Sequence, residues 1–323
     1  MAQIISLLQA ALVFGTVILF GALGEILTEK SGNLNLGVPG IMYLGGIAGL
    51  AGAFGYENSV TTPIPILGLI IAFTCTVVVS MLAGGIYSLL TITLRANQNV
   101  TGLTLTIFGA GAANFFGGHM NKVAGGVGQI SVAATSGAFR STLPFLSNVN
   151  GLSAFGFMVY LAIVIAFVLS WFLNKTRSGL MLRAVGEDPA TADAAGINVL
   201  RYKYLSTCIG AAITGLGGLY YVMDYIKGTW ANDGGIEKLG WLAVALVIFA
   251  RWKPKHAIWG SYLFGVLFWL YFYMDGLTRS SQELFKMLPY IVTIIVLIVF
   301  SMRRERENQP PAKLGLPYFR EDR

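Results

Sequence analysis

The sequence has few charged residues for its length. Asp, Glu, Lys and Arg together make up 11% of its 323 residues, whereas an ordinary soluble domain carries about 25%. So few charges cannot cover the surface of a soluble fold of this size. Hydrophobic residues make up 55% of the chain, and its mean hydropathy is +0.68. We therefore infer that the lipid bilayer is part of its solvent.

The sequence also lacks the side-chain groupings of most enzymes and metal proteins. Cys75 and Cys208 lie within apolar runs, which argues against a disulfide framework. His119 and His256 stand alone and form no metal-binding pattern, so we predict no metal site and no catalytic residue. The chain has no G-x-x-x-x-G-K-[ST] motif. We therefore expect it to bind no cofactor and to have no ATPase site of its own.

The formal net charge of +7 does not indicate a nucleic-acid partner, because no basic stretch with interleaved aromatic residues is visible. A bias of Lys and Arg toward one side of a membrane explains the surplus. The first ten residues lack the basic region of a signal peptide. They are therefore expected to begin a retained membrane span.

A spanning helix needs roughly 20 predominantly apolar residues. The sequence predicts an all-α, polytopic transmembrane bundle formed by one domain, residues 1–323. The segment 239–251 is short enough to be a re-entrant half-helix, but counting it as a span keeps its basic neighbours on one side. The nine predicted spans are 4–27, 36–55, 65–92, 100–118, 153–173, 204–224, 239–251, 257–274 and 286–302.

Lys and Arg in the loops predict the orientation. If segment 174–203 is cytoplasmic, the same side holds 16 of the 22 basic residues, including the basic tail 303–323. This arrangement places the N-terminus outside and the C-terminus inside.

The predicted cytoplasmic segment 174–203 has the pattern of two short helices broken at 186–189. Asp188 followed by Pro189 is typical of a helix start, with a capping acid before proline at the first helical position. A short helical hairpin at the membrane surface has the shape of a docking element.

The junction of the first two spans carries an unusual polar motif. Residues 24–37 read G-E-I-L-T-E-K-S-G-N-L-N-L-G and run directly into an apolar helix. Irregular backbone at membrane depth is tolerated only where it is buried in protein or lines a cavity. We therefore consider Glu25, Asn33, Asn35 and Gly37 candidates for the translocation path; the alternative is an ordinary polar loop between helices.

Three motifs in order resemble one family. The stretch 24–37, the stretch R-A-N-Q-N-V-T-G-L at 95–103 and the stretch G-E-D-P-A-T-A-D-A-A-G-I at 186–197 together resemble permeases of ATP-binding-cassette (ABC) importers. The match is closest to the simple-sugar and nucleoside (BMP-type) branch, which is related to branched-chain amino acid permeases. Many members carry an acid where this chain has Pro39, so no role for a carboxylate there is carried over.

The resemblance implies a site that couples the chain to an ATPase. Arg183, Glu187 and Asp188 would set the register of docking by charge pairs. The small residues Ala192, Ala195 and Gly196 would fit into a groove of the partner, and Gly196 would end the second short helix. Gly186 and Pro189 complete the expected coupling site.

The resemblance also implies an assembly in the bacterial plasma (inner) membrane. The expected partners are a second, homologous permease subunit, a cytoplasmic ABC ATPase that hydrolyses ATP, an extracytoplasmic substrate-binding lipoprotein and the lipid bilayer.

Three further side chains are weaker candidates for the path. Asn97 belongs to the second motif, and Asn114 and Tyr221 lie in apolar spans where they could contact a sugar or nucleobase. Tyr220, Tyr221, Tyr225, Trp230 and Trp241 together are more typical of an aromatic belt at the membrane boundary. Most glycines within the spans are expected to be helix-packing sites.

A nucleoside is the favoured substrate, with simple sugars and branched-chain amino acids as alternatives. An ion-coupled secondary transporter is a further alternative, but it usually has ionisable residues near the bilayer centre, and none is evident here. A membrane enzyme would need paired acids, a histidine cluster or an activated nucleophile.

Overall fold

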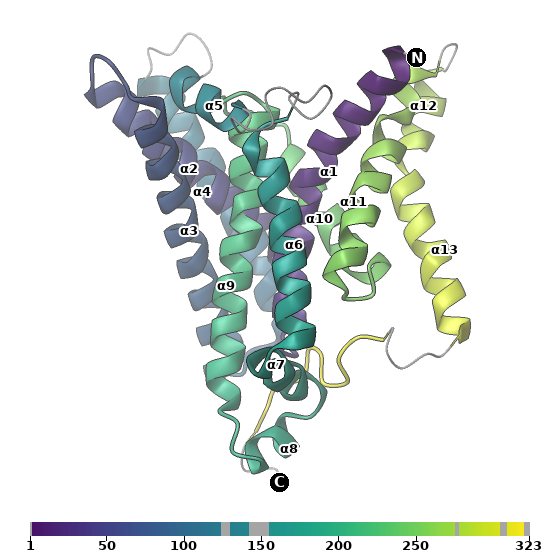
Figure 1. The fold of residues 1–323 in the computed structure, drawn as a ribbon. Helices are drawn as coiled ribbons and strands as arrows, with labels where there is room; N and C mark the ends of the chain where they lie inside the picture. Colours follow the sequence, from purple (N-terminus) through teal and green to yellow (C-terminus); the bar gives the residue numbers. More distant parts are fainter. Residues whose placement is uncertain (1, 124–129, 142–154, 275–277, 304–308, 320–323) are drawn as a thin grey trace.

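In the computed structural model, which describes residues 2–123, 130–141, 155–274, 278–303 and 309–319, all regular structure is helical. The all-α prediction is therefore confirmed (Figure 1). Within these residues, six helices are long and apolar enough to cross a membrane. These are α1 (Ala2–Glu29), α2 (Val38–Ser59), α3 (Pro65–Ser88), α4 (Gln98–Val123), α6 (Phe157–Lys175) and α9 (Val199–Tyr220).

The remaining helices are shorter. They are α5 (Ala133–Arg140), α7 (Arg177–Glu187), α8 (Pro189–Ala194), α10 (Gly235–Phe249), α11 (Pro254–Trp269), α12 (Arg279–Lys286) and α13 (Leu288–Arg303). The last three predicted spans fall on α10, α11 and α13, which have 15, 16 and 16 residues. At 1.5 Å per residue they are about 22–24 Å long, less than the roughly 30 Å of a hydrocarbon core. A short 3₁₀ turn at Leu270–Tyr273 extends α11.

Proline marks several helix starts. Pro39, Pro65, Pro189 and Pro254 each lie in the first turn of their helices, where the missing amide hydrogen leaves no helical bond unmade. α3 and α9 each continue into a π-helical turn. These local signals explain why most predicted boundaries lie close to the observed ones.

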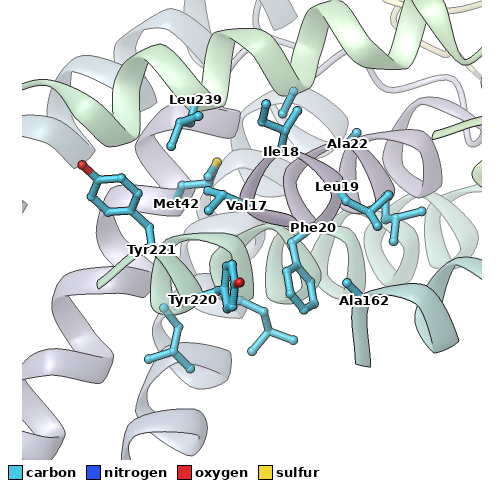
Figure 2. Packing of buried hydrophobic residues seen from close by; sticks show 14 of the residues in the cluster. Val17, Ile18, Leu19, Phe20, Ala22, Met42, Ala162, Tyr220, Tyr221 and Leu239 are labelled. Carbon is cyan, nitrogen blue, oxygen red and sulfur yellow. The ribbon is translucent and has the colours of Figure 1, made fainter. Parts of the chain in front are cut away.

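α1, α2 and α9 form the centre of the bundle. α1 packs against α9, α10, α11 and α6, while α2 packs against α3, α4 and α9. Figure 2 shows side chains from α1, α2, α9 and α10 gathered in this core, among them Phe20 and Tyr220, whose ring centroids are 6.3 Å apart. The outward faces of α3 and α4 carry exposed apolar side chains such as Ile107 and Phe108, as a lipid-facing surface requires.

Glycines allow the central helices to approach closely, as predicted. A Cβ atom on Gly109 of α4 would meet the backbone of Gly40 on α2, and one on Gly45 of α2 would meet the backbone of Gly215 on α9. Lipid tails are as apolar as the helix surfaces, so the hydrophobic effect does not drive helices together inside a membrane. Close backbone contact of this kind provides van der Waals packing instead.

The bundle has two distinct ends. α7 and α8 lie at one end, which we call the hairpin end, and α5 and α12 lie at the opposite end with the N-terminal part of α1 (Figure 1).

Candidate functional site

The polar segment 30–37 between α1 and α2 is irregular in backbone and almost wholly buried. Side chains from three helices, α1, α3 and α4, satisfy several of its backbone groups. The amide of Leu34 donates to Gln98 Oε1 at 2.7 Å, and its carbonyl accepts from the Tyr87 hydroxyl. The carbonyl of Leu36 accepts from Thr106 Oγ1 at 3.0 Å. Non-helical backbone is thereby held inside the protein, where each unpaired group would otherwise be costly.

The structure brings four of the predicted path residues together in this segment. Glu25 and Asn35 are 1% and 2% exposed, and the Asn35 amide donates to Glu25 Oε1 at 2.9 Å. The Gly37 amide donates to Asn35 Oδ1 at 2.9 Å. Asn33 donates from Nδ2 to Thr207 Oγ1 of α9 at 3.0 Å, while its own Oδ1 is buried without a partner. The cluster therefore joins α1, α2 and α9 and retains one open hydrogen-bond acceptor.

The other three path candidates lie elsewhere. Asn97 is exposed and caps α4 by accepting from the Val100 amide at 3.1 Å. Asn114 lies 16 residues beyond Gln98 on α4, about 24 Å along the helix. Tyr221 begins the π-helical turn that follows α9 and stacks on Tyr225, with ring centroids 5.2 Å apart.

The aromatic-belt interpretation was wrong for three of its five residues. Tyr220, Tyr221 and Trp230 are at most 3% exposed and belong to the protein core. Aromatic side chains near the end of a span have the same sequence pattern whether they face lipid or a neighbouring helix. Only the packing of α9 against α1 and α2 separates these two arrangements.

Sequence reasoning missed a second acid in this cluster. Glu29 is 4% exposed and accepts from Trp252 Nε1. Trp252 lies in the turn between α10 and α11, 223 residues away in the chain. Glu29 belongs to the first motif, but nothing in the local sequence indicated a tryptophan as its partner.

Replacing Glu25 by leucine is expected to destabilise the folded chain by about 1–3 kcal/mol, because the buried Asn35 amide would lose its acceptor. Glu25→Gln keeps an acceptor oxygen and is the matched control. Thermal unfolding of the purified proteins in detergent tests this. Equal unfolding temperatures for the two variants would contradict the assigned hydrogen bond.

The predicted hairpin is present at the hairpin end. α7 ends at Glu187 and α8 starts at Pro189. Asp188 caps α8 by accepting from the amides of Ala190 at 3.1 Å and Thr191 at 3.2 Å. Hydrogen bonds from the hydroxyl and the amide of Thr191, and to a lesser extent from the Ala190 amide, hold the pKa of the Asp188 carboxyl below its usual value. The cap is therefore fully formed above the usual pKa of aspartate and is lost as the pH falls through the lowered value.

The end of α8 is also as predicted. Gly196 has a φ of +82°, a left-handed conformation that glycine adopts without steric cost. Its amide donates to the Asp193 carbonyl at 3.0 Å, and the Ile197 amide donates to the Ala192 carbonyl at 3.0 Å. Gly196 therefore terminates the helix.

The small residues of the hairpin do not share one free face, which corrects that expectation. Ala192 is 3% exposed and packs against Val185 and Val199 inside the hairpin. Ala195 and Gly196 are exposed. The surface left for a partner is therefore the end of α8 rather than the side that Ala192 occupies.

The hairpin touches the polar segment backbone to backbone. Gly186 lies near the end of α7, and a Cβ atom there would meet the Lys30 carbonyl and the Gly32 amide. A displacement of α7 cannot be absorbed by side-chain movement at such a contact. Residues 30–32 continue directly into the buried cluster at 33–37.

Residues 309–319 of the basic tail bind across this contact. We call them the tail segment. The Lys313 amide donates to the Gly186 carbonyl, and the Gly315 amide donates to the Gly32 carbonyl, both at 3.2 Å. The tail segment thus holds α7 and the polar segment together. Of the basic tail predicted at 303–323, residues 304–308 and 320–323 lie outside the described part of the chain.

The tail segment also engages side chains of the hairpin. The Ala312 amide donates to Glu187 Oε2 at 3.2 Å, and the Tyr318 hydroxyl donates to Asp193 Oδ2 at 2.9 Å. Arg95, from the second motif, lies over the Phe319 ring at 4.4 Å. Glu187 is therefore engaged within the chain, whereas Arg183 faces a cavity beside α7.

A helical membrane bundle with an exposed hairpin packed directly onto a buried, irregular polar segment has the architecture of a membrane transport protein. Within the described residues, no three His, Cys, Asp or Glu side chains are grouped to hold a metal ion.

The chain belongs to the family described as branched-chain amino acid transport system / permease component, whose sequence model matches residues 7–297. It is a permease of the ABC transporter class, in the simple-sugar and nucleoside branch, and a multi-pass protein of the plasma membrane. Permeases of this class are transport subunits that work with ATPase and substrate-binding partners.

Three relatives illustrate the match. The chain is 33% identical to the putative glucose ABC transporter permease protein TsgC13 of Haloferax volcanii, over 86% of this chain and 78% of that one. It is 31% identical to the nucleoside ABC transporter permease protein NupC of Lactococcus lactis, over 90% of each chain. It is also 31% identical to the guanosine ABC transporter permease protein NupQ of Bacillus subtilis, over 98% of each.

Proposed function

We propose that this chain forms one membrane-spanning half of a nucleoside importer and that the α7–α8 hairpin receives the motion of a separate ABC ATPase. The observation that carries the proposal is the contact of Gly186 with residues 30–32. It offers a mechanical link from an exposed docking element to a buried polar segment between spans. The chain itself would hydrolyse no ATP, and a second, homologous permease subunit would complete the pathway.

In the proposed topology the hairpin end is cytoplasmic, with nine crossings, the N-terminus outside and the C-terminus inside. The surplus of basic residues at the hairpin end supports this orientation. α10 and α11, with its 3₁₀ extension, support the count of nine. α10 starts at Gly235, close to Tyr221, which follows the end of α9. α11 starts after the turn at Trp252, which lies close to Glu29 at the end of α1.

A nucleoside is the favoured substrate because two relatives matching nine-tenths or more of the chain are nucleoside or guanosine permeases. A simple sugar is the second candidate, favoured by the resemblance to the putative glucose permease. The proposed pathway includes the cluster of Glu25, Asn33 and Asn35. Measuring how far unlabelled nucleosides, glucose and leucine inhibit the uptake of labelled guanosine distinguishes these substrates. Uptake that persists without ATP but stops when an ion gradient is removed would contradict the proposal and indicate secondary transport.

Replacing Ala195 by arginine is expected to reduce co-purification of the ATPase subunit at least about tenfold, because a buried and unpaired charge at an interface costs several kcal/mol. Ala195 is exposed at the end of α8, so the fold should be unaffected. Ala133→Arg, at an exposed position of α5 at the opposite end, is the matched control. Loss of the ATPase in both variants, or in neither, would contradict docking at α8.

A further inference from the structure

A cavity of about 370 Å³ lies beside the hairpin, next to the contact between Gly186 and Lys30. Its wall is built from five separate parts of the chain. They are the C-terminal parts of α6 and α7, the residue that follows α1, the turn between α10 and α11, and the start of the tail segment. Residues so far apart in sequence form a built pocket rather than a surface groove on one helix.

Three cations converge on this cavity. Lys30, Arg183 and Lys253 line it, with Glu187 as the one carboxylate among the lining residues. Glu187 already accepts a hydrogen bond from the tail segment. The lining residues therefore carry a net positive charge, and Asn174 adds a polar side chain.

Two observations, one on Arg183 and one on Lys30, favour an anion in this cavity. Arg183 Nε is buried and has no hydrogen-bond partner, although a buried donor is almost always paired. Burial lowers the pKa of the Lys30 ammonium; Glu187 and Glu29 oppose this, while Arg183 and Lys253 lower it further. Like charges held so close are stabilised by an anion that accepts hydrogen bonds from several of them.

We propose that the cavity binds a phosphate group through Lys30, Arg183 and Lys253. A phosphate presents several acceptor oxygens at once, which suits a guanidinium and two ammonium groups better than a single carboxylate does. The site adjoins the buried polar cluster through Lys30 and Trp252 but does not depend on the transported substrate.

The phosphate can come from a phospholipid headgroup or from a soluble molecule. The surroundings favour a lipid. α6 and α11 end and begin at the cavity, and their outward faces expose Trp171 (61%) and Trp259 (80%). Acyl chains could lie along these faces while the headgroup enters the cavity, as basic pockets between helix ends do for anionic lipids.

The test is native mass spectrometry of the full chain in detergent, with added phosphatidylglycerol, phosphatidylcholine, inorganic phosphate or ATP. Retention of phosphatidylglycerol over phosphatidylcholine supports a lipid headgroup, and retention of inorganic phosphate or ATP alone supports a soluble phosphate. In either case Arg183→Gln should weaken binding about tenfold, since a hydrogen bond to a charged group contributes at least that factor.

Lys255→Gln is the matched control, because Lys255 is an exposed cation only two residues from Lys253 and outside the cavity. Lys30→Gln provides a second variant should Arg183→Gln fold poorly. Equal retention of all four ligands, or equal losses in Arg183→Gln and Lys255→Gln, would overturn the proposal. The measurement needs no ATPase, so its failure would leave the proposed transport function untouched.

Discussion

Replacing Gly186 by leucine is expected to reduce uptake at least about tenfold while the chain still inserts in the membrane. The added side chain would meet the Lys30 carbonyl and the Gly32 amide, neither of which can rotate away. Overpacking at such a site costs about 1–3 kcal/mol, which the chain can relieve only by shifting α7 relative to the polar segment. Uptake into vesicles that contain the ATPase subunit is the measurement.

A graded series sharpens this prediction. Gly186→Ala should lose less uptake than Gly186→Leu, because it adds one methyl group to the same contact. Ser178→Leu is the matched control, since Ser178 is exposed on the same helix. Normal uptake by Gly186→Leu would contradict the proposal that motion passes through this contact. Loss of ATPase co-purification in Gly186→Leu would instead place the defect in docking. Co-purification must therefore be measured in parallel.

The second large effect is expected at the crossing of α2 and α4. Gly109→Val should destabilise the folded chain by about 3 kcal/mol or more, because its Cβ atom would meet the carbonyl and Cα of Gly40. Both contacting groups are backbone, so the helices must separate. The unfolded fraction in a denaturing detergent titration measures the loss.

Gly111 offers a close control for this substitution. It lies two residues further along α4, and an added Cβ atom there meets nothing within 4 Å. Gly111→Val should change stability by no more than about 0.5 kcal/mol, as surface substitutions usually do. Comparable losses in the two variants would mean that helix propensity, rather than the close crossing, decides the result.

Much of the fold could be predicted because its signals are local. Apolar run length identified α1, α2, α3, α4, α6 and α9, and proline marked several of their starts. Asp188, Pro189 and Gly196 predicted both ends of α8 because capping involves only neighbouring residues. The last third of the chain was harder, since α10, α11 and α13 are too short for length alone to decide whether they cross.

The parts of the site that could not be predicted involve long-range pairing. The hydrogen bond between Glu29 and Trp252 joins residues 223 positions apart. The tail segment binds Gly32 and Gly186 through backbone groups, which every residue type carries, so no sequence pattern marks them. Ala192 was expected on a free surface because composition cannot show which face of a short helix packs inward.

The tail segment has a consequence for biosynthesis. Residues 309–319 leave the ribosome after every spanning helix described above, yet they clamp a loop from the first tenth of the chain to α7. The connection between the hairpin and residues 30–32 can therefore be locked only once translation has passed the whole bundle. Until then Gly186 and Gly32 would be in contact without the two hydrogen bonds from the tail segment. A nascent chain that stalls early would therefore lack the bonds that hold α7 to residues 30–32.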